Sequence, residues 1–280
     1  MKPFIIAIFP VWVFISNVVK AHVADVSFTV TPTPVVHMVD VFSVSMQKQV
    51  RCMVLLPATY NVSGDPYPVL YLLHGWSGHH ASWLKDAPQL PQLAEQRRML
   101  IVCPDGGYDS WFIDSNVDST VRYETFLTQE LPAFIDYYYH TRAERTGRAI
   151  AGLSMGGHGA LYIALKHPEL FGKAASLAGG LDLRPFQKND WDLKCVLGDP
   201  GTKWKNWEKA SVSYLLDQPR PTYPELMIDC GTDDFFLSVN RDVHLKLKRQ
   251  GVPHVYQERP GGHDAAYWGK TINLVIDWLW

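Results

Sequence analysis

The sequence has no strong excess of charge of either sign. Its 280 residues include 26 Lys and Arg against 28 Asp and Glu, a formal net charge of −2. It also has no Lys/Arg-rich block, so neither nucleic acid nor an anionic membrane is an expected partner, because both attract concentrated positive charge. Repeats, low-complexity tracts and an interdomain linker are missing as well. Since 47% of the residues are hydrophobic, we expect one folded domain rather than a disordered or collagen-like chain.

Cysteine is scarce, with four residues in the whole chain. Their spacing includes no C-x-x-C redox pair and no pattern typical of a zinc site. Cys52, Cys103 and Cys230 each lie in or at the end of an apolar run, where a free cysteine behaves as a small hydrophobic residue. We therefore expect buried thiols, and a disulfide stays an open alternative for a protein outside the cytoplasm.

The apolar run at the N-terminus is too short and too interrupted for a typical membrane span. Met1 and Lys2 give it a basic start, residues 3–19 are mostly apolar, and Lys20-Ala21 ends it. A spanning helix needs about 20 apolar residues, so the pattern favours a cleaved secretory signal at residues 1–21, with an uncleaved anchor as the alternative. Cleavage would leave residues 22–280, secreted or periplasmic, without stable membrane association and with a charge of 24 − 28 = −4.

The rest of the chain alternates between strand-like and helix-like patterns. Apolar runs predict strands at residues 35–43, 49–56, 69–73, 99–103, 148–151, 173–177, 226–230 and 255–258. Helical periodicity predicts helices at residues 123–140, in a segment ending near 166, at 243–250 and at 271–280. The first two strands should pair antiparallel, and the alternation predicts an α/β fold, with a mostly parallel central sheet flanked by helices in a single domain.

Ser154 stands in a G-x-S-x-G pattern, Gly152-Leu-Ser-Met-Gly156, directly after a predicted strand and before a predicted helix. This context is typical of a nucleophile elbow, a turn so tight that glycine is needed beside it and that lifts the serine above the sheet. The N–H groups at the start of the following helix, that of Met155 above all, suit an oxyanion. The alternative is an ordinary glycine-rich turn.

A serine nucleophile needs a base, and an acid to orient the base, and in this architecture they follow in the order Ser, Asp or Glu, His. The run Ile228–Asp234 ends a predicted strand and places carboxylates in the loop beyond it, and His263 follows the last predicted strand after a Pro-Gly-Gly turn. Both segments leave the sheet at the edge where α/β proteins gather their sites. The order Ser154, Asp234, His263 therefore fits.

A second glycine-rich loop, residues 74–78, follows the predicted strand at 69–73. After the third strand, such a loop brings a backbone N–H opposite the elbow and completes an oxyanion hole with the N–H of Met155. Trp76 is our choice for this second donor, with Gly75 and Ser77 as alternatives. A plain glycine turn is the competing interpretation.

The remaining histidines give weaker signals. Four of them lie in predicted helices or connecting segments, where a structural or solvated role is the simpler interpretation: His158, His167, His244 and His254. Three others cluster after the strand at 69–73: His74, His79 and His80. The cluster has neither an H-E-x-x-H frame nor a nearby carboxylate at ligand spacing, so we predict no metal site.

Taken together, the motifs resemble those of the Putative esterase family, which groups S-formylglutathione hydrolases, tributyrin esterases, and the feruloyl and acetyl-xylan esterases of carbohydrate esterase family one. They occur in the family's order: Leu72-Leu-His-Gly-Trp-Ser-Gly78, Pro104-Asp-Gly-Gly107, Gly152-Leu-Ser-Met-Gly-Gly-His-Gly-Ala-Leu161, Cys230-Gly-Thr-Asp-Asp-Phe235 and Pro260-Gly-Gly-His263. The resemblance implies an α/β-hydrolase fold, no cofactor, and ester hydrolysis through an acyl-enzyme. It further implies Ser154 as nucleophile, His263 as base and Asp234, rather than Asp233, as acid.

Substrate preference is less visible in the sequence. Trp191, Trp204 and Trp207 lie between two predicted strands, and Trp111 follows the Pro-Asp-Gly-Gly motif. Flat aromatic rings give large contact areas, so these four are candidate substrate-binding residues. Packing of the same rings onto the sheet is the alternative. The sequence makes no prediction of oligomeric state.

The leading hypothesis is a secreted serine esterase for short-chain or aromatic acyl esters, such as acetyl or feruloyl groups on carbohydrate. A mycolyltransferase-like acyltransferase is one alternative, because related enzymes with the same triad pass the acyl group to a sugar hydroxyl. An S-formylglutathione hydrolase-like thioesterase is another, and the secretory signal argues against it. A noncatalytic binding protein on a hydrolase scaffold is the third, and it should lack one of the triad residues.

Overall fold

The computed structural model describes residues 35–188, 190–218 and 222–280, and the predicted signal segment lies outside them. An eight-stranded sheet runs through this part of the chain in the order β1-β2-β4-β3-β5-β6-β7-β8. The strands are β1 (Val35–Ser43), β2 (Lys48–Leu56), β3 (Val69–Leu73), β4 (Leu100–Pro104), β5 (Arg148–Leu153), β6 (Lys173–Leu177), β7 (Glu225–Gly231) and β8 (His254–Arg259).

Strand direction follows the sequence pattern. β1 and β2 form the predicted antiparallel hairpin, and β2 also pairs antiparallel with β4. From β4 onward in the sheet order, through β3, β5, β6 and β7 to β8, each strand runs parallel to the next. The continuous apolar run of β3 is buried on both faces, as parallel strands covered by helices require. The predicted mostly parallel sheet is confirmed.

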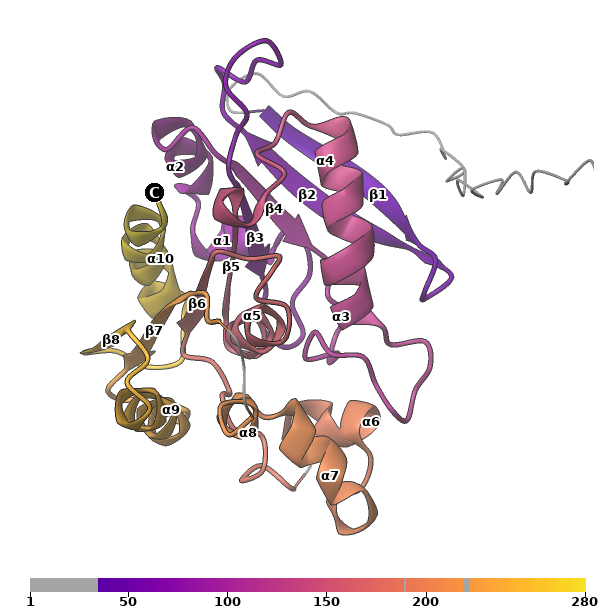
Figure 1. The fold of residues 1–280 in the computed structure, drawn as a ribbon, viewed down its shortest axis with the longest axis vertical. Helices are drawn as coiled ribbons and strands as arrows, with labels where there is room; N and C mark the ends of the chain where they lie inside the picture. The colour runs from indigo at the N-terminus through magenta and orange to yellow at the C-terminus, as the bar shows by residue number, and fades with distance from the viewer. Residues whose placement is uncertain (1–34, 189, 219–221) are drawn as a thin grey trace, which may run out of the picture.

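Helices cover both faces of the sheet (Figure 1). Alternate side chains of β3 divide between two apolar clusters, one under α4, α5 and α9 and the other under α1, α2 and α10. The first three helices span Leu131–Tyr138, Met155–Lys166 and Leu237–Arg249. The second three span Ser82–Asp86, Leu90–Gln96 and Ala265–Leu279.

Three predicted helices have different bounds in the structure, and the one expected at 243–250, α9, already begins at Leu237. The helix expected at 123–140 is divided into α3 (Tyr123–Thr125), a π-helical turn (Phe126–Glu130) and α4. Pro132, which has no N–H to donate, lies in the first turn of α4, directly after the π-helical turn where the hydrogen-bond pattern of the helix changes. The closing helix, α10, begins at Ala265 rather than at 271, because the Asp264 side chain accepts a hydrogen bond from the Tyr267 N–H and caps it.

The long connection between β6 and β7 contains three helices that the periodicity did not predict. They are α6 (Leu193–Leu197), α7 (Pro200–Ala210) and α8 (Val212–Leu215), and they lie together at one end of the molecule, beyond α5 (Figure 1). Asp199 caps α7 through the Gly201 N–H, with Pro200 at its first position. We call residues 182–216 the β6–β7 insert.

The cysteines agree with the expectation of buried thiols. Cys52, Cys103 and Cys230 are buried and free, and Cys195 is free and exposed. Burial raises the pKa of the Cys103 thiol, because it disfavours the thiolate. In the part of the chain that the structure describes, no helix is both long enough and apolar enough to cross a bilayer.

Candidate active site

Ser154 occupies a strained turn between β5 and α5. Its φ is +54° and its ψ is −118°, outside the regions favoured by residues with a side chain. A Cβ at Gly152 would collide with the backbone of Gly156, and a Cβ at Gly156 would collide with the carbonyl of Leu73. Both glycines are therefore required for the turn to fit against β3, which an ordinary strand–helix turn would not need. The elbow sets the serine at the N-terminus of α5.

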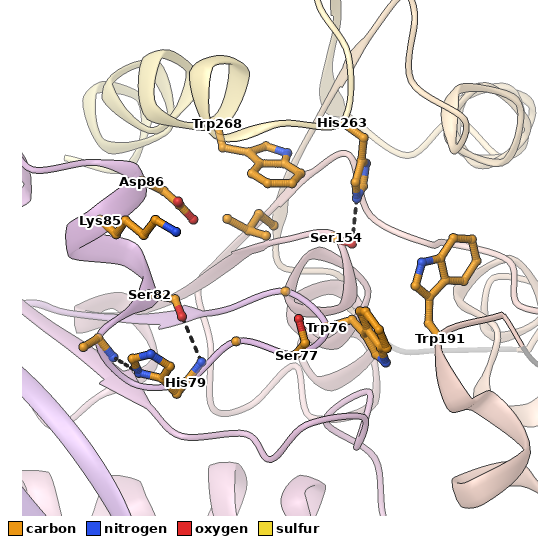
Figure 2. Close-up of a pocket in the computed structure, with 14 residues that line it drawn as sticks. Trp76, Ser77, His79, Ser82, Lys85, Asp86, Ser154, Trp191, His263 and Trp268 are labelled. Atoms are coloured by element: carbon orange, nitrogen blue, oxygen red, sulfur yellow. Dashed lines mark hydrogen bonds between the residues drawn. The ribbon is translucent and has the colours of Figure 1, made fainter.

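The turn brings together the three side chains that the sequence analysis selected. Ser154 Oγ lies 2.9 Å from His263 Nε2, and His263 Nδ1 lies 2.7 Å from Asp234 Oδ2 (Figure 2 shows the first of these contacts). Both distances are those of hydrogen bonds in a working nucleophile–base–acid relay. The Asp234 side chain is fully buried and that of His263 is 14% exposed, so the relay is shielded while the serine end faces a cavity.

The structure distinguishes between the two adjacent aspartates. Asp234 directs one carboxylate oxygen to His263, and the other accepts a hydrogen bond of 2.8 Å from the Phe236 N–H. Asp233 is exposed, and its backbone N–H donates to the Gly261 carbonyl. Only Asp234 is therefore placed to hold the imidazole of His263 in the tautomer with a proton on Nδ1.

A buried polar network supports the loop that carries His263. Tyr267, in the first turn of α10, donates a 2.6 Å hydrogen bond to Asp229, and Arg259 forms a 2.5 Å ion pair with the same carboxylate. Burial raises the pKa of Asp229, and the hydrogen bond from Tyr267 opposes that rise. Because the loop of residues 260–263 runs between Arg259 and α10, the network fixes both of its ends.

The loop after β3 faces the elbow, as the sequence analysis expected. The N–H of Ser77 donates to the Tyr108 carbonyl at 2.8 Å, so Ser77 cannot also donate to an oxyanion. Of the three candidate donors, Trp76 and Gly75 therefore remain opposite Met155. Gly75 packs directly against Leu153 and Ser154. The Trp76 indole also donates, through Nε1, to Asp192 of the insert at 3.2 Å.

His74 has a role in this loop that the sequence analysis missed. Its Nδ1 donates to the Gly75 carbonyl at 2.7 Å, and its Nε2 accepts a hydrogen bond from the Gly106 N–H at 2.8 Å. Burial lowers the pKa of His74 to about 4, so the imidazole is neutral at pH 7, as these two bonds require. His74 thus ties the oxyanion loop to the end of β4.

A cavity of about 550 Å³ opens beside Ser154. Trp191 lies on one side of the serine and Trp268 on another, with Lys85 and Asp86 of α1 at the end remote from Trp191 (Figure 2). This volume is typical of small-molecule sites. Trp268, Lys85 and Asp86 had no motif to reveal them, because they reach the cavity only through the packing of α1 against α10.

The four predicted substrate-binding tryptophans have different positions. Trp191 lines the cavity and stacks on Phe235 at 5.4 Å. Trp111 and Trp207 are 1% and 0% exposed, and their indole N–H groups donate to backbone carbonyls within the core. Trp204 is 38% exposed on α7 and does not line the cavity. Of the four, only Trp191 therefore lines this cavity, whereas Trp111 and Trp207 are core residues and Trp204 lies on the exposed side of the insert.

Among the residues the structure describes, no group of three or more His, Cys, Asp or Glu side chains has the arrangement of a metal site. His79 Nδ1 accepts a hydrogen bond from the Ala81 N–H, and His80 lies 3.6 Å from Asp105. Together with the bonds of His74, these contacts give the histidine cluster a structural explanation.

Comparison with known proteins agrees with this geometry. A sequence model of the Putative esterase family matches residues 43–276. An acetyl esterase of Caldicellulosiruptor saccharolyticus is 27% identical over 86% of this chain and 96% of its own length. An endo-1,4-beta-xylanase/feruloyl esterase of Xylanibacter ruminicola is 33% identical over 74% of this chain, which corresponds to 30% of that longer protein.

Among solved structures, the substrate-bound serine hydrolase FphF of Staphylococcus aureus superposes with a TM-score of 0.78. The match covers 88% of this chain and 98% of that one, at 23% sequence identity. At this identity the likeness establishes the fold alone, and the α/β-hydrolase fold expected from the motifs is confirmed.

Proposed function

The chain belongs to the Putative esterase family and is a carboxylic ester hydrolase, and from this we propose that it works as a serine esterase through an acyl-enzyme on Ser154. The observation that carries the proposal is the continuous chain of hydrogen bonds from Ser154 through His263 to Asp234. A binding protein on a hydrolase scaffold would have no need of this connected arrangement.

The reaction proceeds in two halves. Ser154 Oγ attacks the ester carbonyl carbon while His263 Nε2 takes its proton, and the Asp234 carboxylate stabilises the resulting imidazolium. The N–H groups of Met155 and Trp76 bind the negative oxygen of the tetrahedral intermediate. The C–O bond to the alcohol then breaks as His263 returns the proton to the leaving oxygen. Water, deprotonated by the same imidazole, attacks the acyl carbon, the bond to Ser154 Oγ breaks as His263 returns that proton to it, and the acid is released.

We further propose that the substrates are short-chain or aromatic acyl esters, such as acetyl or feruloyl groups on carbohydrate. Tryptophan side chains line the cavity beside the serine, and flat indole rings are surfaces against which acyl groups and sugar rings pack. The acetyl esterase and the xylanase/feruloyl esterase among the relatives favour the same substrate class. The expected signal at residues 1–21 supports action outside the cytoplasm, and N-terminal sequencing of exported protein should begin at His22.

A substrate panel tests the proposal. We expect kcat/KM for acetyl, butyryl and feruloyl esters to exceed that for S-formylglutathione. Ser154→Ala should lower turnover by at least about 10⁴-fold while the melting temperature stays within a few degrees, because the nucleophile is lost and the core is untouched. Substantial activity in Ser154→Ala, or a clear preference for S-formylglutathione, would contradict it. Addition of a sugar acceptor should leave hydrolysis dominant, and efficient transfer would instead favour the acyltransferase alternative.

A further inference from the structure

The cavity beside Ser154 ends at two charged residues that the mechanism does not use. Lys85 and Asp86 line it from the C-terminal end of α1, with the indole of Trp268 between them and His263 (Figure 2). Within the described ranges, neither the Lys85 ammonium nor the Asp86 carboxylate forms a hydrogen bond or an ion pair with another residue.

Helix stability does not explain Asp86. It is the last residue of α1, where the partial negative charge of the helix end repels a carboxylate. Burial also raises the pKa of Asp86, which shows that the site disfavours its charge. The charge of the adjacent Lys85 opposes that rise, and a polar group that enters the cavity would further offset the cost of the half-buried carboxylate.

The wall that carries these residues is firmly held. Gln89 donates a 2.6 Å hydrogen bond to the Gly269 carbonyl, which joins the segment after α1 to α10. A Cβ at Gly269 would collide with the carbonyl of Asp86, so the two backbones are in direct contact. The backbone at Asp86 is thereby set at a fixed position relative to Trp268, and the exposed Lys85 side chain extends from the same turn of α1.

The chemistry of this end of the cavity favours a neutral, hydroxylated ligand. The two charges cancel, so an ion of either sign gains little, whereas a hydroxyl group can donate to Asp86 and accept from Lys85. The ring of Trp268 offers a flat apolar surface next to them.

We propose that Lys85, Asp86 and Trp268 form a subsite that binds a hydroxyl-bearing part of the ester substrate. The inference rests on the proposed esterase function and extends it, because it assigns substrate preference to particular residues. A hydroxylated group can belong to the alcohol, as in a sugar, or to the acyl chain, as in a hydroxycinnamoyl group. Binding this group should improve kcat/KM for the hydroxylated ester over an ester of similar shape without hydroxyls.

Two matched pairs of esters test the subsite in the full chain. The first pair is an acetylated methyl xyloside and cyclohexyl acetate, which differ in the alcohol. The second is methyl hydroxycinnamate and methyl cinnamate, which differ in the acyl group. We expect the wild type to prefer the hydroxylated member of at least one pair, and the pair that shows the preference identifies the source of the hydroxyl.

Asp86→Ala and Lys85→Met should each reduce that preference by about tenfold, the loss expected for a hydrogen bond to a charged group. Asp86→Asn, which keeps an acceptor, should recover part of it. Asp242→Ala, an exposed aspartate on α9, is the matched control and should leave the preference unchanged. Each preference is the ratio of kcat/KM for two esters measured on one preparation. Partial misfolding lowers both values by the same factor and therefore leaves the ratio unchanged.

An unchanged preference in both Asp86→Ala and Lys85→Met would overturn the subsite. A loss of kcat/KM in these two variants that is confined to S-formylglutathione would also overturn it, because the two charges would then bind a charged ligand instead. These outcomes are distinct from failure of the esterase proposal, which would appear as wild-type protein unable to hydrolyse any ester of the panel in a Ser154-dependent manner.

Discussion

At the carboxyl edge of the sheet, the ends of strands position the triad side chains. In the β6–β7 insert, the packing of helices positions the tryptophan side chains. Ser154, Asp234 and His263 follow β5, β7 and β8 closely, so the register of neighbouring strands sets their separation. In the insert, Trp191 reaches the cavity while Trp207 is buried and Trp204 points outward. The sheet edge thus supplies the chemistry, and the insert supplies one wall of the cavity while its buried side chains extend the core cluster under α5.

The largest expected effect separates two adjacent residues at the sheet edge. Asp234→Asn should lower kcat by about 10³- to 10⁴-fold, because the amide cannot hold His263 in the productive tautomer. Asp233→Asn should leave kcat within about twofold, since Asp233 is exposed and bonds through its backbone only. Steady-state kinetics on one aryl ester measures both. Equal losses in the two variants would show that position relative to the strand end does not select the acid.

Substitutions in the insert should change the free energy of unfolding rather than the catalytic rate. Trp207→Ala should lower the free energy of unfolding by about 3–5 kcal/mol, because it empties a buried ring site. Trp204→Ala, on the same helix, should change it by less than about 0.5 kcal/mol. Denaturant titrations of the two variants give the comparison directly. A large loss in Trp204→Ala would mean that the outer face of α7 is covered by something in solution.

Acid should weaken both regions, since each is contacted by a buried neutral histidine, the sheet edge by His74 and the insert by His158 of α5. His158 donates from Nε2 to the Ala210 carbonyl of α7, and burial lowers its pKa to about 4, as it does for His74. The unfolded chain binds these protons near pH 6.5, so stability falls as the pH drops from about 6.5 towards 4. Between pH 7 and pH 5 each histidine should cost about 2 kcal/mol of unfolding free energy.

Unfolding free energies measured at several pH values test this expectation. His158→Asn removes one titrating group, so its stability should change less steeply with pH than that of the wild type, whatever its stability at pH 7. Identical slopes for the two proteins would contradict a neutral buried imidazole at this position.

The smallest effect should come from the contact that links the two regions. Trp76→Phe keeps the backbone N–H of the oxyanion loop but removes the indole bond to Asp192. We expect kcat to fall by about three- to tenfold with little change in KM, the consequence of a less firmly placed oxyanion donor. Asp192→Asn keeps an acceptor and should lose less than Asp192→Ala. An effect on KM alone would assign this contact to substrate binding.

Much of the sheet could be predicted from sequence because buried parallel strands need continuous apolar runs. β1, β3 and β6 have the predicted bounds, and the others differ by one or two residues. The helices were harder. Two residues of α7 illustrate this, because Trp204 and Trp207 are the same residue type three positions apart, yet Trp204 is 38% exposed and Trp207 is fully buried.

By itself, the sequence determined the strand order along the chain, the elbow at Ser154 and the succession of serine, acid and histidine. These features are local, since a strand, a glycine-bounded turn and a loop after a strand depend on neighbouring residues. Only the tertiary structure decided that Asp234 faces His263, that Trp191 alone of the four predicted tryptophans lines the cavity, and that Lys85 and Asp86 meet Trp268. Each of these outcomes depends on contacts between segments far apart in the chain, and the packing of those segments is set by the whole core.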